Sequence, residues 1–367
     1  MERRELRPFP FAIRHPEAYN GSASRLIAAA NSLLRQPSPS MSSVRGRIVG
    51  CAAAFVLPLV GALGAAPARK PASLRRVAVA DSGHVAAHAS AELPPALRAA
   101  VDDSLRGASG KLEMRFLDAN LHTRGTGLFA RIFGSAALRQ PGVYIVDDSS
   151  LSRPFAFVAM RSFSDKAHDG SIGSYRIGFW PGERGHSRTA AYANPDGFIE
   201  VTRGNVSLPV SEHFQLGDFL THGQSSVWPK YLVLHERLVD KLELVIAELE
   251  REGIPVRHMT VMSGFRTPAY NADGGTTSGR SSVSRHMYGD ASDVFVDNDG
   301  DGRMDDLNGD GRVDARDAQV IVDAADRVER AHPELVGGEG VYPATAAHGP
   351  FAHVDARGTR ARWGLIR

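Results

Sequence analysis

Three residues, His286, Asp293 and His353, constrain this chain more than any other feature of its sequence. His286 and Asp293 are seven residues apart with Gly289 between them, and His353 follows some sixty residues later. Asp293 begins the run Asp-Val-Phe-Val-Asp and His353 lies in Phe-Ala-His-Val-Asp, and both runs alternate as strands do. Two imidazoles and one carboxylate held on strands can bind a divalent metal and leave one position open for water, which is the ligand set of a catalytic zinc site.

A second constraint is the acidic stretch 297–317. From Asp306, oxygen-bearing side chains recur at positions 1, 3, 5, 9 and 12, with Gly311 at position 6 and Val313 at position 8. This spacing is typical of an EF-hand calcium loop, although Asp replaces the usual Glu at position 12. A second phase from Asp297 overlaps the first, so the two cannot both be independent EF-hands. We predict a calcium-binding insert, with a solvated acidic loop as the alternative. The candidate ligands are Asp306, Asn308, Asp310, Arg312, Asp314 and Asp317 in the first phase and Asp297, Asp299, Asp301 and Asp305 in the second.

Four ordered motifs carry a resemblance. The segment Ser-x-His-x-x-Gly-x-Ala-x-Asp from Ser284, with the later His-Val-Asp, resembles the zinc D-alanyl-D-alanine carboxypeptidase family and its murein endopeptidase relatives. Ser-Gly-Phe-Arg-Thr-Pro from Ser263 and the C-terminal segment from Gly340 to Trp363 are similar to the same family. The resemblance covers residues 211–367 and implies zinc binding by the two histidines and Asp293. The acidic insert resembles dockerin loops.

The resemblance also implies two residues that meet the substrate. Arg266 matches an arginine that contacts substrate near the scissile bond, where a guanidinium can hold a carboxylate or stabilise an oxyanion. Its alternative is an ion pair within the protein. Ser284 matches a serine that can hydrogen-bond the substrate, and a turn residue is the alternative there.

The general base is less well defined. Many members of the family have an acidic residue three positions before the last histidine, where this chain has Pro350. Because residues two apart on a strand share a face, Asp355 points the same way as His353 and is the nearest acidic candidate. Its alternative role is to orient that ligand. His348 is a candidate for transition-state stabilisation, because a histidine at that position has this role in some relatives.

The remaining patterns predict an α+β fold. Residues 111–209 hold short apolar runs between turn-forming clusters, which predicts a β-rich domain of unknown role. Its Tyr175, Phe179 and Trp180 form either a binding surface or part of the core. In residues 210–367 we expect a small antiparallel sheet with flanking helices that carries the zinc site. A helix with an apolar stripe from Tyr231 to Leu249 and another over 315–332 are predicted.

Residues 1–65 have the marks of a leader and secretory signal peptide. A basic start after Met41 precedes an apolar run over 48–63 and a small-residue end. Met41 is the expected true start, and the run is shorter than the roughly 20 residues that span a bilayer. No stable membrane span is expected after cleavage, with an uncleaved anchor as the alternative. Residues 66–110 are expected to be a linker with one short helix near 97–105. Cys51, the single cysteine, excludes an internal disulfide and a cysteine-based metal site.

These features together predict a function. The leader holds eight of the 43 basic and three of the 41 acidic residues, so the exported part has a net charge near −3 and no nucleic-acid partner is expected. We expect a periplasmic or extracellular, monomeric zinc peptidase associated with the cell wall and acting on peptidoglycan or muropeptides. D,D-carboxypeptidase, D,D-endopeptidase and L,D-endopeptidase activities remain open. The alternative, favoured by Pro350, is a catalytically silent wall-binding module stabilised by calcium.

Overall fold

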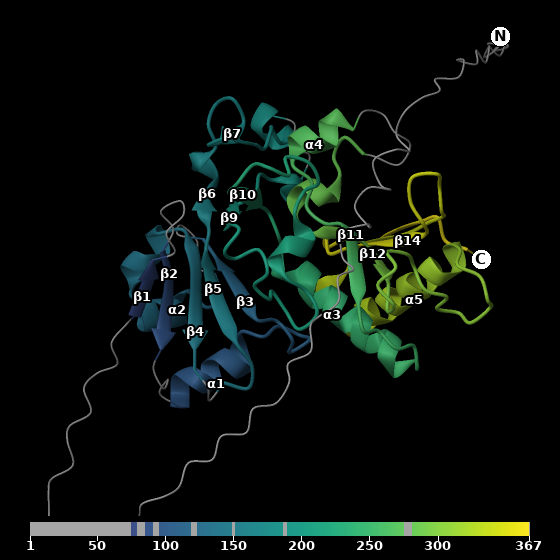
Figure 1. Ribbon diagram of the computed structural model, residues 1–367, viewed down its shortest axis with the longest axis horizontal. Coiled ribbons are helices and arrows are strands. Elements are labelled where there is room, and N and C mark those ends of the chain that lie inside the picture. The colour runs from purple at the N-terminus through teal and green to yellow at the C-terminus, as the bar shows by residue number, and fades with distance from the viewer. Residues whose placement is uncertain are drawn as a thin grey trace, which may run out of the picture. The chain divides into compact units, whose positions relative to one another are not determined.

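His286 lies in a 3-10 turn, and Asp293 and His353 lie on neighbouring strands of one mixed sheet in the computed structural model. Its strands are β11 (Met259–Ser263), β12 (Ala291–Val296), β13 (Gly338–Tyr342), β14 (Phe351–Asp355) and β15 (Ala361–Trp363). They are arranged in the order β11-β12-β14-β13-β15 (Figure 1). Neighbours are antiparallel except β13 and β15, which are parallel. The expected antiparallel sheet is therefore right for four strands and wrong for the last.

The structure describes most of the chain after residue 74. The described ranges are 75–78, 85–90, 95–118, 123–148, 151–185, 189–274 and 281–366. Helices and sheets are mixed along these residues, which confirms the α+β class. The predicted signal peptide, Met41 and Cys51 lie outside them. Within the described part, no helix combines the length and apolar character that a bilayer crossing requires.

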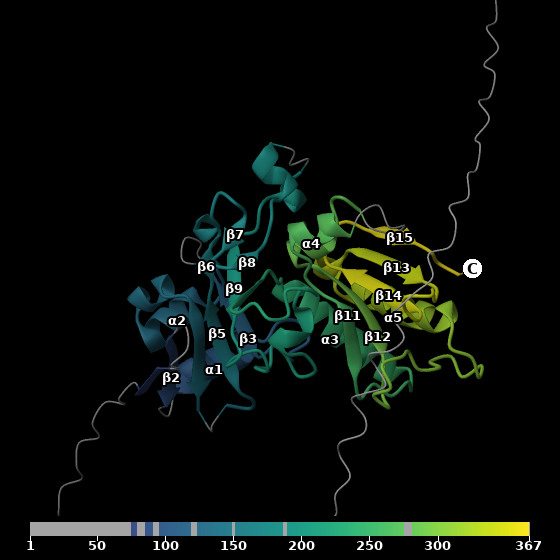
Figure 2. The same cartoon turned by 45° about the horizontal axis from the view of Figure 1, so that its top comes forward.

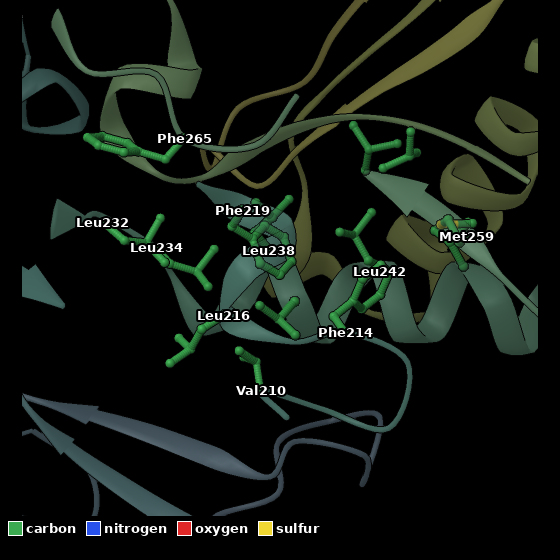
Figure 3. Close-up of a cluster of buried hydrophobic side chains, with 14 of the residues drawn as sticks. Val210, Phe214, Leu216, Phe219, Leu232, Leu234, Leu238, Leu242, Met259 and Phe265 are labelled. Carbon is green, nitrogen blue, oxygen red and sulfur yellow. The ribbon is translucent and has the colours of Figure 1, made fainter. Parts of the chain in front are cut away.

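Two long helices cover this sheet. Helix α3 (Glu236–Arg251) packs on α5 (Ala315–Ala331), and α5 packs on β13 and β14. Figure 3 shows the apolar face of α3 meeting side chains from the preceding loop and strands. The predicted helix over 315–332 is confirmed. The helix expected from Tyr231 begins later, because Tyr231 pairs with Glu200 in an extended strand and the N-cap is His235.

The region before residue 119 adds to a second sheet. Strands β1 (Arg75–Ala78) and β2 (Val85–Ser90) and helix α1 (Pro95–Ser104) lie where a linker was expected. The short helix expected there is present as α1. Strand β2 pairs with β4 in parallel, giving the sheet order β1-β2-β4-β5-β3. Alanine and serine dominate β2, so its sequence carries no apolar alternation that predicts a strand. The other elements of this part are β3 (Met114–Leu117), α2 (Thr126–Phe133), β4 (Gly142–Asp147) and β5 (Phe155–Ala159).

A third sheet joins the two predicted domains. Strand β9 (Gly197–Val201) pairs with β10 (Lys230–Leu232) on one side and β6 (Arg161–Ser162) on the other. Residues on both sides of the expected boundary near residue 210 therefore share a sheet, and the described residues belong to one compact unit. In the stretch 175–180, only β8 (Tyr175–Arg176) is a strand, and it pairs with β7 (Ser171–Ile172).

The three aromatic residues of that stretch divide between core and surface. Tyr175 and Trp180 are buried, whereas Phe179 is 37% exposed. Trp180 packs against Phe163, with ring centroids 5.5 Å apart. Two of the three therefore belong to the core, which disfavours a shared binding surface.

Candidate metal centre

Strand register brings the three candidate ligands together. Asp293 on β12 and His353 on β14 are direct partners in the antiparallel ladder. His286 lies in the 3-10 turn η6 (Arg285–Tyr288), which ends at Gly289 and leads into β12. Gly289 has a φ of +70°, and a Cβ there would lie 2.3 Å from the Val233 carbonyl oxygen. Only glycine therefore fits this turn, which returns His286 over the sheet.

The inner atoms of the trio are spaced as ligands of one ion. His286 Nε2 lies 3.2 Å from His353 Nδ1 and 3.2 Å from Asp293 Oδ1. The third distance, from His353 Nδ1 to Asp293 Oδ1, is 2.9 Å. A tetrahedral zinc ion with bonds of about 2.0–2.1 Å holds its ligands roughly 3.3 Å apart. All three residues are buried, and the donor set fits zinc.

Each histidine has an outer hydrogen bond that fixes its ring. His286 Nδ1 lies 2.8 Å from the Gly264 carbonyl oxygen, an acceptor, so this nitrogen donates. His353 Nε2 lies 3.2 Å from Asp355 Oδ2 and donates in the same way. With the outer nitrogens protonated, the inner lone pairs of both neutral rings face Asp293. Two lone pairs and a carboxylate that face one point can bind a metal ion, and outer partners of this kind orient the ligands of metal sites.

Without a metal, burial and mutual contacts shift the pKa values of the three residues in different directions. Burial lowers the pKa of His286, although Asp293 partly opposes this effect. Burial also disfavours protonated His353, but hydrogen bonds to Asp293 and Asp355 outweigh it and raise the pKa of His353 to about 9. Burial works against the Asp293 anion, yet its contacts with both histidines hold the pKa of Asp293 well below its usual range. A proton on His353 thus balances the Asp293 charge where a metal ion would otherwise do so.

Arg266 supports a ligand. Its Nη2 donates to Asp293 Oδ2, and its Nε donates to Ser263 Oγ at 2.8 Å. The expected ion-pair alternative is therefore present, and the guanidinium also lines the cavity above the trio. Arg266 therefore both holds Asp293 and lies at the cavity.

Asp355 lies behind His353 and not in the cavity. Its side chain is fully buried and accepts hydrogen bonds from the backbone N–H of Gly338 at 2.6 Å and of Arg357 at 3.1 Å. The Arg357 Nε donates to both oxygens at 2.9 Å. His353 and Arg357 outweigh burial and hold the pKa of Asp355 well below its usual range. This geometry favours the orienting role over that of general base, because no oxygen of Asp355 reaches the cavity.

A cavity of about 740 Å³ opens over the trio. The predicted Ser284 and His348 line it, and His348 is half-buried with its ring 5.0 Å from that of Phe351. Asp293 is the one acidic residue among its described lining residues. Sequence reasoning missed the wall residues Tyr192 and His222 and gave Trp363 no role, although the Trp363 ring lies 5.0 Å from that of His353. Nothing in their local patterns marks Tyr192 or His222 as cavity residues, whereas Trp363 lies in a segment that carries the family resemblance.

The acidic insert folds as two similar turns. Asp297 accepts hydrogen bonds from the backbone N–H groups three, four and five residues ahead, and Asp306 does the same. The sequence explains this likeness, because 297–305 and 306–314 both read Asp-x-(Asp/Asn)-Gly-Asp-Gly-Arg-x-Asp, and these two segments begin the two predicted phases of the EF-hand pattern.

The carboxylates of the insert gather to different degrees. Those of Asp297, Asp299 and Asp305 offer atoms within 4.8 Å of one another. In the second turn, Asp310 lies 3.3 Å from Arg316 Nη1, and the buried Asp317 accepts from the backbone N–H of Leu307 at 2.8 Å. The carboxylates therefore lie closer together in the first turn. In the second turn, Asp317 instead holds the backbone at Leu307. Asp301, Asn308, Arg312 and Asp314 make contacts within these turns or with the start of α5.

A third acidic cluster is already neutralised. The carboxylates of Asp326, Glu329 and Glu339 lie within 4.8 Å of one another. Lys241 and Arg362 lie among them, with Lys241 Nζ 2.7 Å from Glu329 Oε1 and Arg362 Nη2 3.0 Å from Glu339 Oε2. This cluster is an ion-pair network.

No protein-family model, curated protein or solved structure matches this chain. The resemblance to zinc peptidases stays a prediction that depends on the motifs and on the geometry of the trio.

Proposed function

We propose that this chain is an exported zinc metallopeptidase that hydrolyses peptide bonds in peptidoglycan stem peptides or cross-links. The observation that carries the proposal is the convergence of His286, Asp293 and His353 beneath a cavity, with an outer hydrogen bond fixing each histidine. An ion pair of histidine and aspartate needs no such spacing of three inner atoms. Three protein ligands leave a fourth position for water, as in catalytic zinc sites.

The chain's own residues supply positioning and proton transfer. A bound zinc ion lowers the pKa of its water toward neutrality and polarises a peptide carbonyl. Arg266 keeps Asp293 in place and directs a fixed positive charge into the cavity, where it can stabilise an oxyanion. Asp355 holds the ring of His353. With Asp355 behind the ligand, His348 is the cavity residue best suited to take up and return a proton.

The cavity wall fits a peptide with a free carboxylate. Arg266, Arg285 and Arg357 line it, while Asp293 is the one acidic group on its described surface. Tyr192, Tyr342 and Trp363 also line it. Each guanidinium already pairs with an aspartate of the protein, but a guanidinium has five N–H donors, so the carboxylate that ends a stem peptide can bind those that these pairs leave unused.

We propose calcium as the ligand of the acidic insert. Seven aspartates and two asparagines lie in two consecutive turns, and carboxylates this close repel one another unless a cation is present. The oxygen-only donor set and the glycines of positive φ at positions 300, 302, 309 and 311 fit calcium loops. The calcium would have a structural role, because the insert directly follows β12, the strand that carries Asp293.

A catalytically silent wall-binding module is the second candidate. Pro350 stands where many relatives of the resembled family have an acidic residue, and no other carboxylate among the described residues lines the cavity beside Asp293. A module of this kind would bind muropeptides and metal without turnover.

The test is incubation of purified protein with muropeptides, with product masses and zinc content measured together. We expect about one zinc per chain, cleaved stem peptides, and loss of both zinc and cleavage in His286→Ala. His168→Ala, which replaces an exposed histidine outside the cavity, should behave as the wild type. Full zinc content in His286→Ala would overturn the site. Full zinc and binding without cleavage in the wild type would favour the silent module.

A further inference from the structure

The β-rich region contributes a wall to the metal cavity. We define the bridging segment as residues 177–185 and 189–192, which follow β8 and include the 3-10 turn η4 (Ala190–Tyr192). In Figure 2 the teal chain after β8 runs beside α4 (Pro268–Asp273). Tyr192 lines the same cavity as His286 and His353. One described wall of the candidate active site therefore comes from a region for which the sequence predicted no role.

The bridging segment holds the turn that carries His286. The Trp180 Nε1–H donates to the Met287 carbonyl oxygen at 2.7 Å, and both residues are buried. Arg285 Nη1 donates to the Ala191 carbonyl oxygen. These bonds come from outside residues 210–367 and fix the backbone directly beside His286. A shift of this turn would move His286 Nε2 away from the other two ligand atoms.

The same segment is fixed to the other side of the cavity. The Ala269 backbone N–H donates to the Ile177 carbonyl oxygen at 2.9 Å. Gly178 has a φ of +88°, and a Cβ there would lie 2.6 Å from the Ala269 nitrogen. Backbone therefore packs on backbone where the segment meets α4, three residues after Arg266. The segment joins the Arg266 and His286 sides of the cavity.

Tyr192 is held by contacts that leave it at the cavity. Its ring lies 5.4 Å from that of Tyr288 at an interplanar angle of 87°, and the Arg285 guanidinium lies 5.0 Å from its centroid. Arg285 is fixed in turn by Asp290, with Nε 3.0 Å from Oδ1. A half-buried aromatic ring on this support is a rigid contact surface for a ligand.

We propose that the bridging segment is a built part of the active site, with Trp180 as a positioning residue for His286 and Tyr192 as a specificity-determining residue for the stem peptide. The part played by Tyr192 rests on the proposed peptidase function. The part played by Trp180 concerns metal affinity alone. Together the two residues give the β-rich region a role in the site that residues 210–367 do not fulfil by themselves.

The first experiment measures the zinc dissociation constant of Trp180→Phe by competition with a chelator. Phenylalanine keeps an apolar ring but cannot donate to the Met287 carbonyl. We expect the dissociation constant to rise by roughly 3- to 10-fold, the range that one lost hydrogen bond allows. Phe179→Leu changes an aromatic residue of the same segment that is 37% exposed and outside the cavity lining, and should leave the constant unchanged. An unchanged constant in Trp180→Phe, with a native circular dichroism spectrum, would overturn the positioning role.

The second experiment compares KM and kcat of Tyr192→Ala, Tyr192→Phe and the wild type on a disaccharide tetrapeptide. We expect Tyr192→Ala to raise KM by about tenfold with kcat within twofold and full zinc, as loss of a uniform binding contact does. Tyr192→Phe should restore KM, because the contact belongs to the ring. An unchanged KM in Tyr192→Ala, or a loss of zinc that accounts for the change, would overturn the specificity role.

The two proposals fail separately. If the wild type binds zinc but cleaves no muropeptide, the proposed peptidase function fails. The bridging segment is then judged by the zinc constant of Trp180→Phe and by the dissociation constant of the same tetrapeptide for Tyr192→Ala. An unchanged constant in both measurements would overturn the inference, whatever the activity of the wild type.

Discussion

The metal trio and the acidic insert are four residues apart in sequence, between Asp293 and Asp297, yet they are built in opposite ways. The trio comes from η6, β12 and the distant β14, and its outer hydrogen bonds come from Gly264, which follows β11, and from Asp355 on the same strand as His353. In the insert, each turn is closed by hydrogen bonds from backbone N–H groups only a few residues ahead. The first site depends on the fold, and the second depends largely on its own sequence.

This difference sets how each site should respond to change. Trio ligands are buried and pre-positioned, so the loss of one partner affects the others through a shared rigid sheet. The candidate ligands of the insert are exposed or half-buried, except the buried Asp297 and Asp317, and are held by local turns, so one substitution should act on that turn alone. Three predictions test this contrast, from the largest expected effect to the smallest.

Asp355→Asn should weaken zinc binding more than it lowers the turnover per bound zinc ion. Loss of a carboxylate that orients a histidine ligand costs about 10- to 100-fold in metal affinity, because His353 and Arg357 lose a charged partner. Turnover per bound zinc should change by less than tenfold. Zinc titration with parallel activity assays measures both quantities, and Asp323→Asn on the exposed face of α5 is the matched control. Intact zinc affinity with a turnover loss of 100-fold or more would make Asp355 the general base after all.

Calcium should stabilise the protein through the insert. A ligand at 100 times its dissociation constant adds about 2.7 kcal/mol to the free energy of unfolding, which corresponds to roughly 5–10 °C in Tm for a domain of this size. Thermal melting with calcium and with a calcium-selective chelator measures the shift.

Single-turn variants sharpen this test. Asp299→Ala and Asp310→Ala each remove one exposed or half-buried carboxylate from one turn. If each turn binds its own ion, each variant should lose about half the calcium shift. If one ion is shared, either variant should lose all of it. Zinc retention should rise with calcium, because β12 joins Asp293 to the insert. Identical melting curves and zinc content in both conditions would show that the insert binds no structural calcium.

The contrast also explains what the sequence could predict. The turns of the insert and the strands around Asp293 and His353 follow from local spacing, and the structure has β12 and β14 at those positions. The trio could be named only from its motif context, because strand register depends on packing far from the motif. The sequence could not decide whether Asp355 is the general base or orients His353, and it could not show that Tyr192 lines the cavity. Both questions depend on which side of a strand or segment faces the cavity.

Two misread elements have the same physical cause. Strand β2 joins a sheet although its sequence is mostly alanine and serine, because pairing with β4 fixes it from outside. Tyr231 fits the helical period of α3 but is held in β10 by its pairing with β9. In both cases tertiary pairing overrides local preference.

The smallest expected effect concerns buried charge beneath the trio. Lys241 Nζ donates to the Asp355 carbonyl oxygen at 2.9 Å and faces the Glu329 and Glu339 carboxylates. Burial and the nearby Glu329 outweigh the charges of Lys241 and Arg362 and raise the pKa of Glu339 from its ordinary 4.5 to about 8. The folded state thus keeps a proton that the unfolded chain releases, so this contribution to stability is complete below pH 4.5 and is lost as the pH rises to about 8.

Glu339→Gln should remove that pH dependence, because the amide stays neutral throughout. The Tm of the wild type relative to this variant should therefore fall by a few degrees between pH 5 and pH 8, with all samples in excess zinc and calcium. Glu250→Gln, at an exposed position of α3, should give a difference that does not change with pH. The acidic insert has no buried charge network of this kind among its described contacts, so Asp299→Ala should also show a constant difference over the same range. A Tm difference for Glu339→Gln that stays flat would mean that Glu339 is ionised in the folded protein, with Lys241 and Arg362 outweighing its burial.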